Sequence, residues 1–182
     1  HPGLVERLAI LNAPHPVLMR RKLATLAQAR RSSYVFFFQL PWLPERSLAR
    51  HRAGFLKGML KRDPATPGAF TQEEIEAYRE AFLQPGAATA TVNYYRAAFR
   101  SGTRIPGLRR SLEKVPTLVL WGEGDRYLGP ELLDGLDELV PDLRLVRIPN
   151  ASHWLPADAA DLVNAELVSF FGNVVMKSLR GM

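Results

Sequence analysis

Two residues with acid–base chemistry follow strand-like runs in the last third of the chain. Asp125 comes after the apolar run 117–121, and His153 comes after the run 143–148. In an open parallel sheet, ligands bind beyond the carboxyl ends of the strands. A carboxylate that accepts a hydrogen bond from one imidazole nitrogen fixes the tautomer and leaves the other nitrogen free to act as a base. An Asp and then a His after successive strands is also the order of the second half of a hydrolase triad.

Other interpretations of these positions stay open at the level of residue types. A turn-forming Asp and a hydrogen-bonded loop His would give the same pattern. Glu123 competes with Asp125 as the acid, because it lies two residues nearer the strand and between two glycines that leave the loop permissive. His15, in the segment Asn12-Ala-Pro-His-Pro16, is a further conceivable base or ligand, although a loop residue between two prolines is the simpler interpretation.

Alternating strand and helix signals predict how these residues are positioned. The apolar run 4–11 is stopped by two prolines and predicts a buried strand, as does the run 116–121. The run 143–148 predicts another strand. Helices are expected over 130–140 and from Asp158 to about Leu179. This order is typical of an α/β protein in which a parallel sheet carries a helical insertion after one strand.

The insertion shows helical signals without strand alternation. Helices are predicted over 18–31, over 45–61, from Thr71 to Leu83 and over 89–99. The segment Thr71-Gln-Glu-Glu74 is a capping box, which opens the third of these helices. We therefore divide the chain into a core strand and loop (1–16), a helical lid (17–105) and the C-terminal part of the core (106–182).

Composition excludes several classes of protein and site. The chain has 182 residues, of which 47% are hydrophobic and 23% are charged, which is a globular composition. It has no cysteine, so disulfides, thiolate metal sites and a cysteine nucleophile are excluded. No two of the four histidines have metal-ligand spacing, and we expect neither a metal nor an organic cofactor. No run approaches the roughly 18 apolar residues of a transmembrane helix; we expect a cytoplasmic protein, with an anchor ahead of His1 left open.

The net charge of +6 is unevenly distributed. Residues 1–62 hold 12 Lys and Arg against 2 acids, giving +10, whereas the remaining residues hold 12 against 16, giving −4. A local basic face can attract acidic ligands, membranes or nucleic acid. A solvated, Arg-rich helical surface is the simpler interpretation, and because no nucleic-acid motif accompanies the charge we expect no nucleic-acid partner.

Several short motifs resemble one enzyme family. They are Leu11-Asn-Ala-Pro-His-Pro16, Ser32-Ser-Tyr-Val-Phe-Phe-Phe-Gln39, Pro41-Trp-Leu-Pro-Glu45, Gln84-Pro-Gly86, Asn93-Tyr-Tyr-Arg96, Leu120-Trp-Gly-Glu-Gly-Asp125 and Ala151-Ser-His-Trp154. In this order they are similar to the epoxide hydrolases of the α/β-hydrolase superfamily, in particular the branch of mammalian epoxide hydrolases 3 and 4. They span nearly the whole chain, and several motifs in order are far more specific than any one of them.

The resemblance implies an α/β-hydrolase fold with a helical lid and assigns four catalytic residues. Tyr34 and Tyr95 match the lid tyrosines that bind the epoxide oxygen, Asp125 matches the triad acid and His153 matches the triad base. A phenol is neutral at pH 7 and can donate a proton as the alkoxide forms. Tyr94 in place of Tyr95 as the donor, and Tyr34 as a packing residue, are the alternatives that the residues leave open.

Three aromatic residues are candidates for the wall of a substrate pocket. They are Phe38, Trp42 and Trp154, and their bulk favours an apolar substrate. Aromatic clusters more commonly form core packing, which is the competing interpretation for each.

The family's nucleophile elbow and oxyanion loop have no counterpart in this sequence, and the resemblance places both before His1. We therefore expect the C-terminal portion of an epoxide hydrolase that opens an apolar epoxide to a diol through an aspartyl ester. The expected partners are the epoxide, water and the N-terminal half of the enzyme, which would cover the otherwise unpaired edge of strand 4–11. A homodimer is a further expectation. The alternatives are a haloalkane or haloacetate dehalogenase and a non-catalytic binding protein on the same scaffold.

Overall fold

Three parallel strands form the sheet in a computed structural model that describes residues 4–101 and 115–179. Their order is β1 (Leu8–Leu11), β2 (Thr117–Gly122) and β3 (Leu143–Ile148), with β2 in the centre. Leu8 pairs with Thr117, and Thr117 pairs with Leu143, so all three strands end at the same edge. The predicted parallel sheet is confirmed, although β1 begins at Leu8 and not at residue 4.

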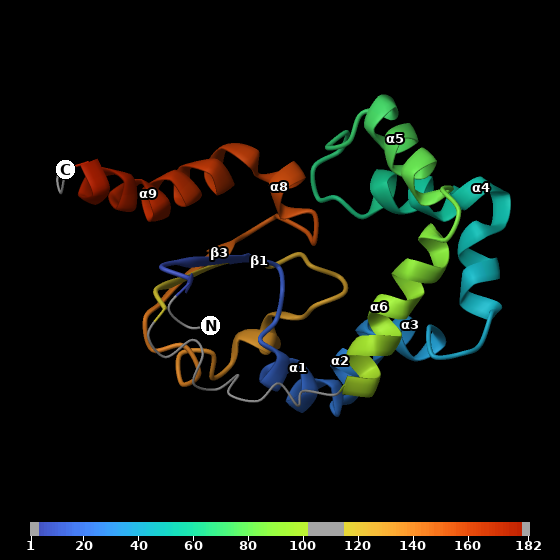
Figure 1. The fold of residues 1–182 in the computed structure, drawn as a ribbon, viewed down its shortest axis with the longest axis horizontal. Coiled ribbons are helices and arrows are strands. Elements are labelled where there is room, and N and C mark those ends of the chain that lie inside the picture. The colour runs from blue at the N-terminus through green and yellow to red at the C-terminus, as the bar shows by residue number, and fades with distance from the viewer. Residues whose placement is uncertain (1–3, 102–114, 180–182) are drawn as a thin grey trace.

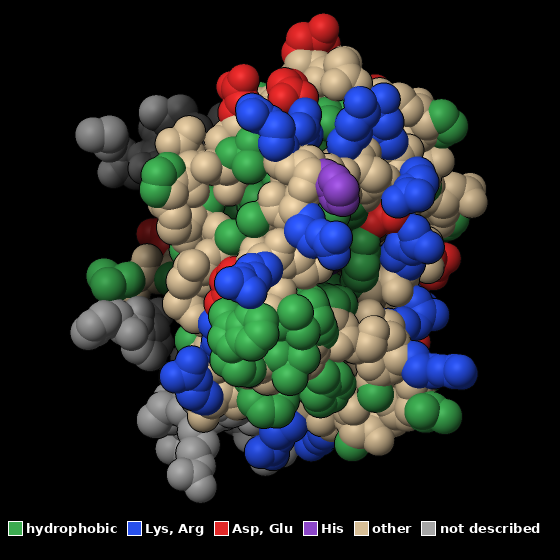
Figure 2. Space-filling model, turned by 90° about the vertical axis from the view of Figure 1, so that its right-hand side faces the viewer, with side chains coloured by type: hydrophobic (Ala, Val, Ile, Leu, Met, Phe, Trp, Pro, Cys, Tyr) green, Lys and Arg blue, Asp and Glu red, His purple; other side chains and the backbone are tan. Residues whose placement is uncertain are grey.

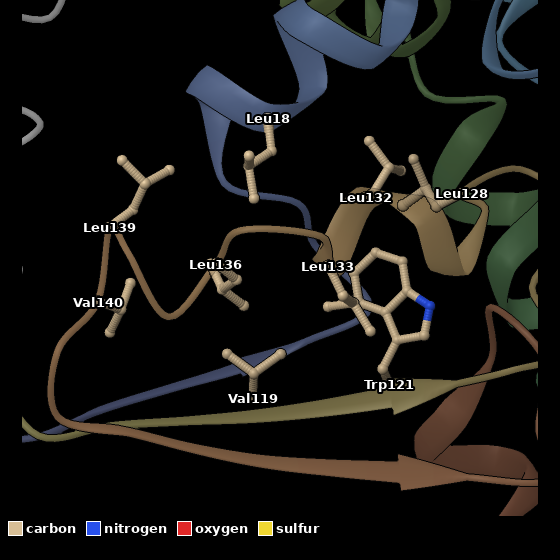
Figure 3. Packing of buried hydrophobic residues seen from close by; sticks show 9 residues of the cluster. All are labelled: Leu18, Val119, Trp121, Leu128, Leu132, Leu133, Leu136, Leu139 and Val140. Atoms are coloured by element: carbon tan, nitrogen blue, oxygen red, sulfur yellow. The ribbon is translucent and has the colours of Figure 1, made fainter.

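Strand β2 is buried on both faces, as its continuous apolar sequence predicts. Alternate side chains point to opposite faces of a strand. Val119 and Trp121 therefore face one hydrophobic cluster, in which Leu18 lies opposite the strand (Figure 3), whereas Leu118 and Leu120 face another. The first cluster consists of Leu18, Val119, Trp121, Leu128, Leu132, Leu133, Leu136, Leu139 and Val140. The second consists of Leu118, Leu120, Ile148, Ala151, Leu155, Val163 and Phe170.

In the described part of the chain between β1 and β2, the structure has six helices. They are α1 (Pro16–Leu23), α2 (Leu26–Arg31), α3 (Ser33–Phe37), α4 (Leu43–Arg62), α5 (Gln72–Phe82) and α6 (Ala87–Ser101). Figure 1 shows α4, α5 and α6 grouped at one end of the molecule, away from the long C-terminal helix. Seen from that end in Figure 2, Lys and Arg side chains spread over the surface. The helical nature of this segment agrees with the sequence; the predicted lid boundary at residue 105 lies outside the described residues.

Side-chain caps decide where the lid helices begin. Thr71 accepts a hydrogen bond from the Glu74 amide (3.2 Å) and the Glu74 carboxylate accepts one from the Thr71 amide (2.7 Å), which is the predicted capping box. The helix predicted over 18–31 is divided into two, because Thr25 caps α2 by accepting from the Gln28 amide. Helix α4 is interrupted inside the range Arg50–Ala53, where three residues have positive φ.

The helix predicted over 130–140 is wrong. Only a short 3-10 helix, η2 (Pro130–Leu133), forms there. Asp134 is extended and Gly135 has a φ of +78°, so helical geometry cannot continue past η2. Leu136 and Val140 nevertheless pack into the first cluster, and this buried spacing is what resembles a helical pattern.

Among the described residues after β3, two helices form in place of the one that the sequence predicts. Helix α8 covers Leu155–Asp158 and helix α9 covers Ala160–Leu179, with the non-helical residue Ala159 between them. Leu155, Val163 and Phe170 pack from these helices onto the second cluster. In the part of the chain that the structure describes, no helix combines the length and the apolarity needed to cross a membrane.

Candidate active site

Asp125 and His153 meet at the edge where β2 and β3 end. The His153 Nδ1 atom lies 2.7 Å from Asp125 Oδ2. Asp125 is only 2% exposed, and its Oδ1 atom accepts hydrogen bonds from the Tyr127 amide (2.8 Å) and the Leu128 amide (2.9 Å). These amides orient the carboxylate so that Oδ2 faces the imidazole. A proton on Nδ1 then satisfies Asp125 and leaves Nε2 as the basic nitrogen.

Glu123, the competing acid, lies elsewhere. Its carboxylate pairs with Arg147 at 3.6 Å, and both side chains are exposed to solvent. The structure therefore brings Asp125, and not Glu123, to His153.

The loop after β3 approaches the end of β2 so closely that a side chain at position 122 would collide with its backbone. A Cβ atom on Gly122 would lie 2.5 Å from the Ser152 carbonyl oxygen and 2.6 Å from that of Ala151. The Gly124 amide donates to the Ala151 carbonyl at 2.9 Å. Glycine at position 122 is therefore required for the approach that places Asp125 beside His153.

Asn12 joins the end of β1 to the end of β2 and to the loop after β3. Its side-chain amide donates to the Ser152 carbonyl (2.6 Å), and its side-chain oxygen accepts from the Gly122 amide (2.7 Å). Asn12 is 5% exposed and has a φ of +41°, a left-handed conformation that Asn tolerates better than most residues. The sequence predicts Asn12 only as part of a loop, although a polar residue directly after an apolar strand is a signal of this position.

Tyr34 from α3 and Tyr95 from α6 lie together on the lid side of this edge. Their rings are 5.6 Å apart and nearly perpendicular. The ring of Tyr127, which is not among the site residues predicted from the sequence, lies 6.0 Å from that of Tyr34 and 5.3 Å from that of His153. A continuous set of rings thus connects the two lid tyrosines with the imidazole.

Both lid tyrosines are held in the neutral form. Burial raises the pKa of Tyr34, and the nearby Tyr95 and Asp125 raise it further. Burial also raises the pKa of Tyr95, and the nearby Tyr94 raises it further. The hydrogen bond between Tyr95 and Tyr34 lowers the pKa of Tyr95 and so opposes part of this rise. Each phenol therefore keeps its proton at neutral pH and is able to donate it in a hydrogen bond.

The predicted pocket aromatics separate into two groups. Phe38 is buried, with its ring 5.0 Å from that of Tyr95, and Trp154 lies edge-on to His153 at 5.9 Å. Trp42 is 62% exposed and its ring stacks beneath the guanidinium of Arg46 at 5.1 Å. The structure brings Phe38 and Trp154 to the tyrosines and the histidine but does not bring Trp42 there.

A comparison with protein families identifies the family to which the chain belongs. Residues 2–160 match the model of a protein family that is described as "alpha/beta hydrolase fold". The chain belongs to the α/β-hydrolase fold family.

Several α/β-hydrolases that are similar to this chain are named epoxide hydrolases. The chain is 35% identical over 176 residues to human epoxide hydrolase 4, covering 93% of this chain and 48% of that protein. It is 37% identical over 160 residues to mouse epoxide hydrolase 3, covering 86% and 42%. A crystal structure of an epoxide hydrolase from Bacillus megaterium matches with a TM-score of 0.76 at 26% identity, covering 94% of this chain and 62% of that one. The chain spans about half the length of the curated relatives it matches.

His15 has a structural position within this α/β-hydrolase core. Its Nδ1 atom accepts from the Val17 amide at 3.3 Å and so caps α1. The side chain is buried, its Nε2 atom has no hydrogen-bond partner within the described residues, and desolvation lowers the pKa of the imidazole. Among the described residues, no group of three or more His, Asp or Glu side chains is placed to hold a metal ion.

The loop between α4 and α5 is tied to the two loops that carry Asp125 and His153. Asp63 in this loop accepts a hydrogen bond from the Tyr127 hydroxyl and pairs with Arg126 at 2.6 Å. The Thr66 amide donates to Asp158 Oδ1 (2.8 Å), and the other oxygen of Asp158 accepts from the Ser152 amide (2.7 Å). These lid–core links were not predicted, because nothing in the sequence pairs a loop residue with a partner about 60 to 90 positions away.

Proposed function

We propose that this chain carries the acid pair and the water-activating residues of an epoxide hydrolase that converts an apolar epoxide to a vicinal diol. The observation that carries the proposal is the pairing of Tyr34 with Tyr95, 5.6 Å apart, on the side of the site where Tyr127 links them to His153. Relatives named epoxide hydrolase at 35–37% identity support it.

In the first step, a carboxylate attacks an epoxide carbon and the carbon–oxygen bond of the ring breaks. The nucleophile in this proposal comes from the part of the relatives' length that this chain does not span. Negative charge develops on the ring oxygen, where Tyr34 and Tyr95 donate hydrogen bonds and one of them transfers its proton. Neutral donors directed at a developing oxyanion in a partly dry site are an effective form of catalysis.

In the second step, water cleaves the resulting ester. His153 Nε2 removes a proton from the water, and the hydroxide attacks the ester carbonyl. His153 then gives this proton to the leaving alkoxide, which completes the diol. The nucleophile's carboxyl group, which received the hydroxide with its remaining proton, passes that proton to the tyrosinate left by the first step, so the carboxylate and the phenol are both restored. Asp125, 2.7 Å from Nδ1, stabilises the imidazolium that exists between these transfers.

The surroundings favour an apolar substrate. Phe38 contacts Tyr95, and Trp154 contacts His153, so a substrate between the phenols and the imidazole would meet aromatic surface. No cofactor takes part in either step of this proposal, because water and side chains supply every proton and bond.

Turnover of styrene oxide by the protein at its natural length tests the proposal. Tyr95→Phe and Tyr34→Phe each lose one donor to the oxyanion, and we expect turnover to fall by about 100-fold in each. Full turnover in Tyr95→Phe would refute the assigned role. His153→Gln should perform the first step only, so intact-mass spectrometry should detect enzyme plus one substrate. Release of halide from a chloroalkane, without diol from the epoxide, would assign a dehalogenase instead.

A further inference from the structure

Trp42 belongs to a group of exposed apolar side chains that the proposed reaction does not use. The group lies on α3, on the loop that follows it, at the first residue of α4 and near the end of α6. Its members, with their exposed fractions, are Phe36 (44%), Leu40 (44%), Trp42 (62%), Leu43 (43%) and Phe99 (50%). Figure 2 shows hydrophobic side chains gathered into one patch at this end of the molecule, with Lys and Arg side chains around it. Contiguous exposed apolar surface of this kind marks an interaction site.

The apolar patch is held firmly to the lid. The Phe36 and Phe99 rings are 6.3 Å apart, which joins α3 to α6. Arg96 donates to the Leu40 carbonyl at 2.5 Å and pairs with Glu45 at 2.6 Å, so α6 fixes both the loop and the start of α4. The patch is therefore a preformed surface, which reduces the ordering cost of binding a partner.

Unpaired cations begin beside the apolar patch at Arg46 and continue along α4. Helix α4 exposes six cations, Arg46, Arg50, Arg52, Lys57, Lys61 and Arg62, and none of them forms an ion pair with another residue of the described ranges. The one acid of this helix, Glu45, is already neutralised by Arg96. The Arg46 guanidinium lies over the Trp42 ring, so the apolar and cationic groups form one surface.

We propose that this lid surface docks on an anionic phospholipid bilayer. Trp42, Leu40 and Leu43 enter the interfacial layer, where Trp is favoured, while the cations of α4 contact lipid phosphates. A second copy of the chain would bring two positive surfaces together, which is unfavourable. Nucleic acid would match the charges but would leave the leucines exposed. Docking does not depend on the proposed enzymatic activity, although an apolar epoxide would concentrate in the same bilayer.

Vesicle binding tests this surface on the protein at its natural length. We expect cosedimentation with vesicles of phosphatidylcholine and phosphatidylserine, weaker binding to phosphatidylcholine alone, and loss of binding as salt is raised. Trp42→Ser should weaken binding about tenfold through lost apolar burial. Arg46→Glu and Arg50→Glu should each weaken it about fivefold or more. Val168→Ser, at a 71% exposed position on α9, is the matched control and should bind normally.

Tryptophan fluorescence separates docking from other associations. Of the three tryptophans, Trp121 is fully buried and Trp42 is the exposed one. We expect anionic vesicles to shift the fluorescence emission maximum to the blue. Loss of this shift in Trp42→Ser would assign it to insertion of Trp42. The proposal fails if neither vesicle binds, or if binding is indifferent to these substitutions. It also fails if Trp42→Ser instead dissociates a dimer in sedimentation velocity, because the surface would then be an interface between copies. Vesicle binding and fluorescence do not depend on turnover. The docking proposal and the proposed hydrolase activity can therefore fail independently.

Discussion

Asn12 acts at the scale of a single residue because its one side-chain amide satisfies backbone groups at the end of β2 and in the loop after β3. The Gly122 amide and the Ser152 carbonyl are buried in this region, and a buried polar group without a partner is costly. Both groups lie within three residues of Asp125 or His153. Asn12 is therefore a positioning residue, which acts on the chemistry only through the loops that it holds.

Replacing Asn12 should lower the free energy of unfolding and should slow the two proposed chemical steps to different extents. We expect Asn12→Ala to lower the free energy of unfolding by about 2 kcal/mol, because two buried backbone groups lose their partner. Asn12→Asp should cost more, because a carboxylate would face the Ser152 carbonyl oxygen. Urea denaturation measures both losses, and Asn164→Ala at an exposed position of α9 is the control. Slower hydrolysis of the ester, with epoxide opening less affected, is the expected kinetic effect; equal slowing of both steps would contradict a role through Asp125 and His153.

The tyrosines give the site a defined response to alkaline pH. The folded-state pKa values of Tyr34 and Tyr95 are raised above the ordinary value of about 10, chiefly by burial. A raised pKa means that these phenols favour folding below about pH 10, and that this contribution is lost as the pH rises toward the folded-state values. Part of the phenolate absorbance should therefore appear only well above pH 10, and Tyr34→Phe should reduce that part. Complete titration of all tyrosines near pH 10 would contradict this.

At the scale of elements, the contact between the β2 and β3 loops depends on the absence of a side chain. We expect Gly122→Ala to destabilise the protein by about 2 kcal/mol or more, because its Cβ would meet two backbone oxygens that belong to the next strand's loop. The same change at Gly172 in α9 meets no atom within 4 Å and should stabilise the helix by about 0.5–1 kcal/mol. Thermal unfolding of both variants gives the comparison. A stable Gly122→Ala variant with an unchanged His153 environment would show that the loops are free to separate.

At the scale of the whole molecule, two carboxylates connect the lid with the core. Asp63 binds Tyr127 and Arg126, and Asp158 binds Thr66 and Ser152. The partners of the two carboxylates include residues beside Asp125 and His153. Lid position and the geometry of the Asp125–His153 pair are therefore coupled through short polar links.

Removing Asp158 tests this coupling. Asp158→Ala leaves the Ser152 and Thr66 amides without their acceptor, and we expect a loss of about 2–3 kcal/mol in stability. Hydrogen exchange at the Thr66 amide should accelerate more than exchange in β2. Asp137→Ala, at an exposed position outside these links, is the control and should change stability by less than about 0.5 kcal/mol. Uniform acceleration across the sheet would mean that Asp158 supports the fold as a whole.

The sequence by itself determined the elements whose cause is local. A continuous apolar run predicted β2, and a largely apolar run of strand length predicted β3. The Thr71 capping box predicted the start of α5. These signals are local because they consist of adjacent residues. The order of strands and helices together with the short motifs predicted the α/β-hydrolase family. The same local reasoning failed at 130–140, where buried leucines in successive turns imitate a helix.

Only the tertiary structure decided which distant groups meet. It brought His153 to Asp125 and not to Glu123, made His15 a helix cap, and placed Trp42 on the surface and not beside Tyr95. It also revealed Asn12, Tyr127 and Asp158 as residues that connect strands, rings and lid. The physical reason is that these contacts are made by short-range hydrogen bonds and packing between residues far apart in the chain. Their partners are set by the register of the parallel strands and the path of the lid, which no local pattern encodes.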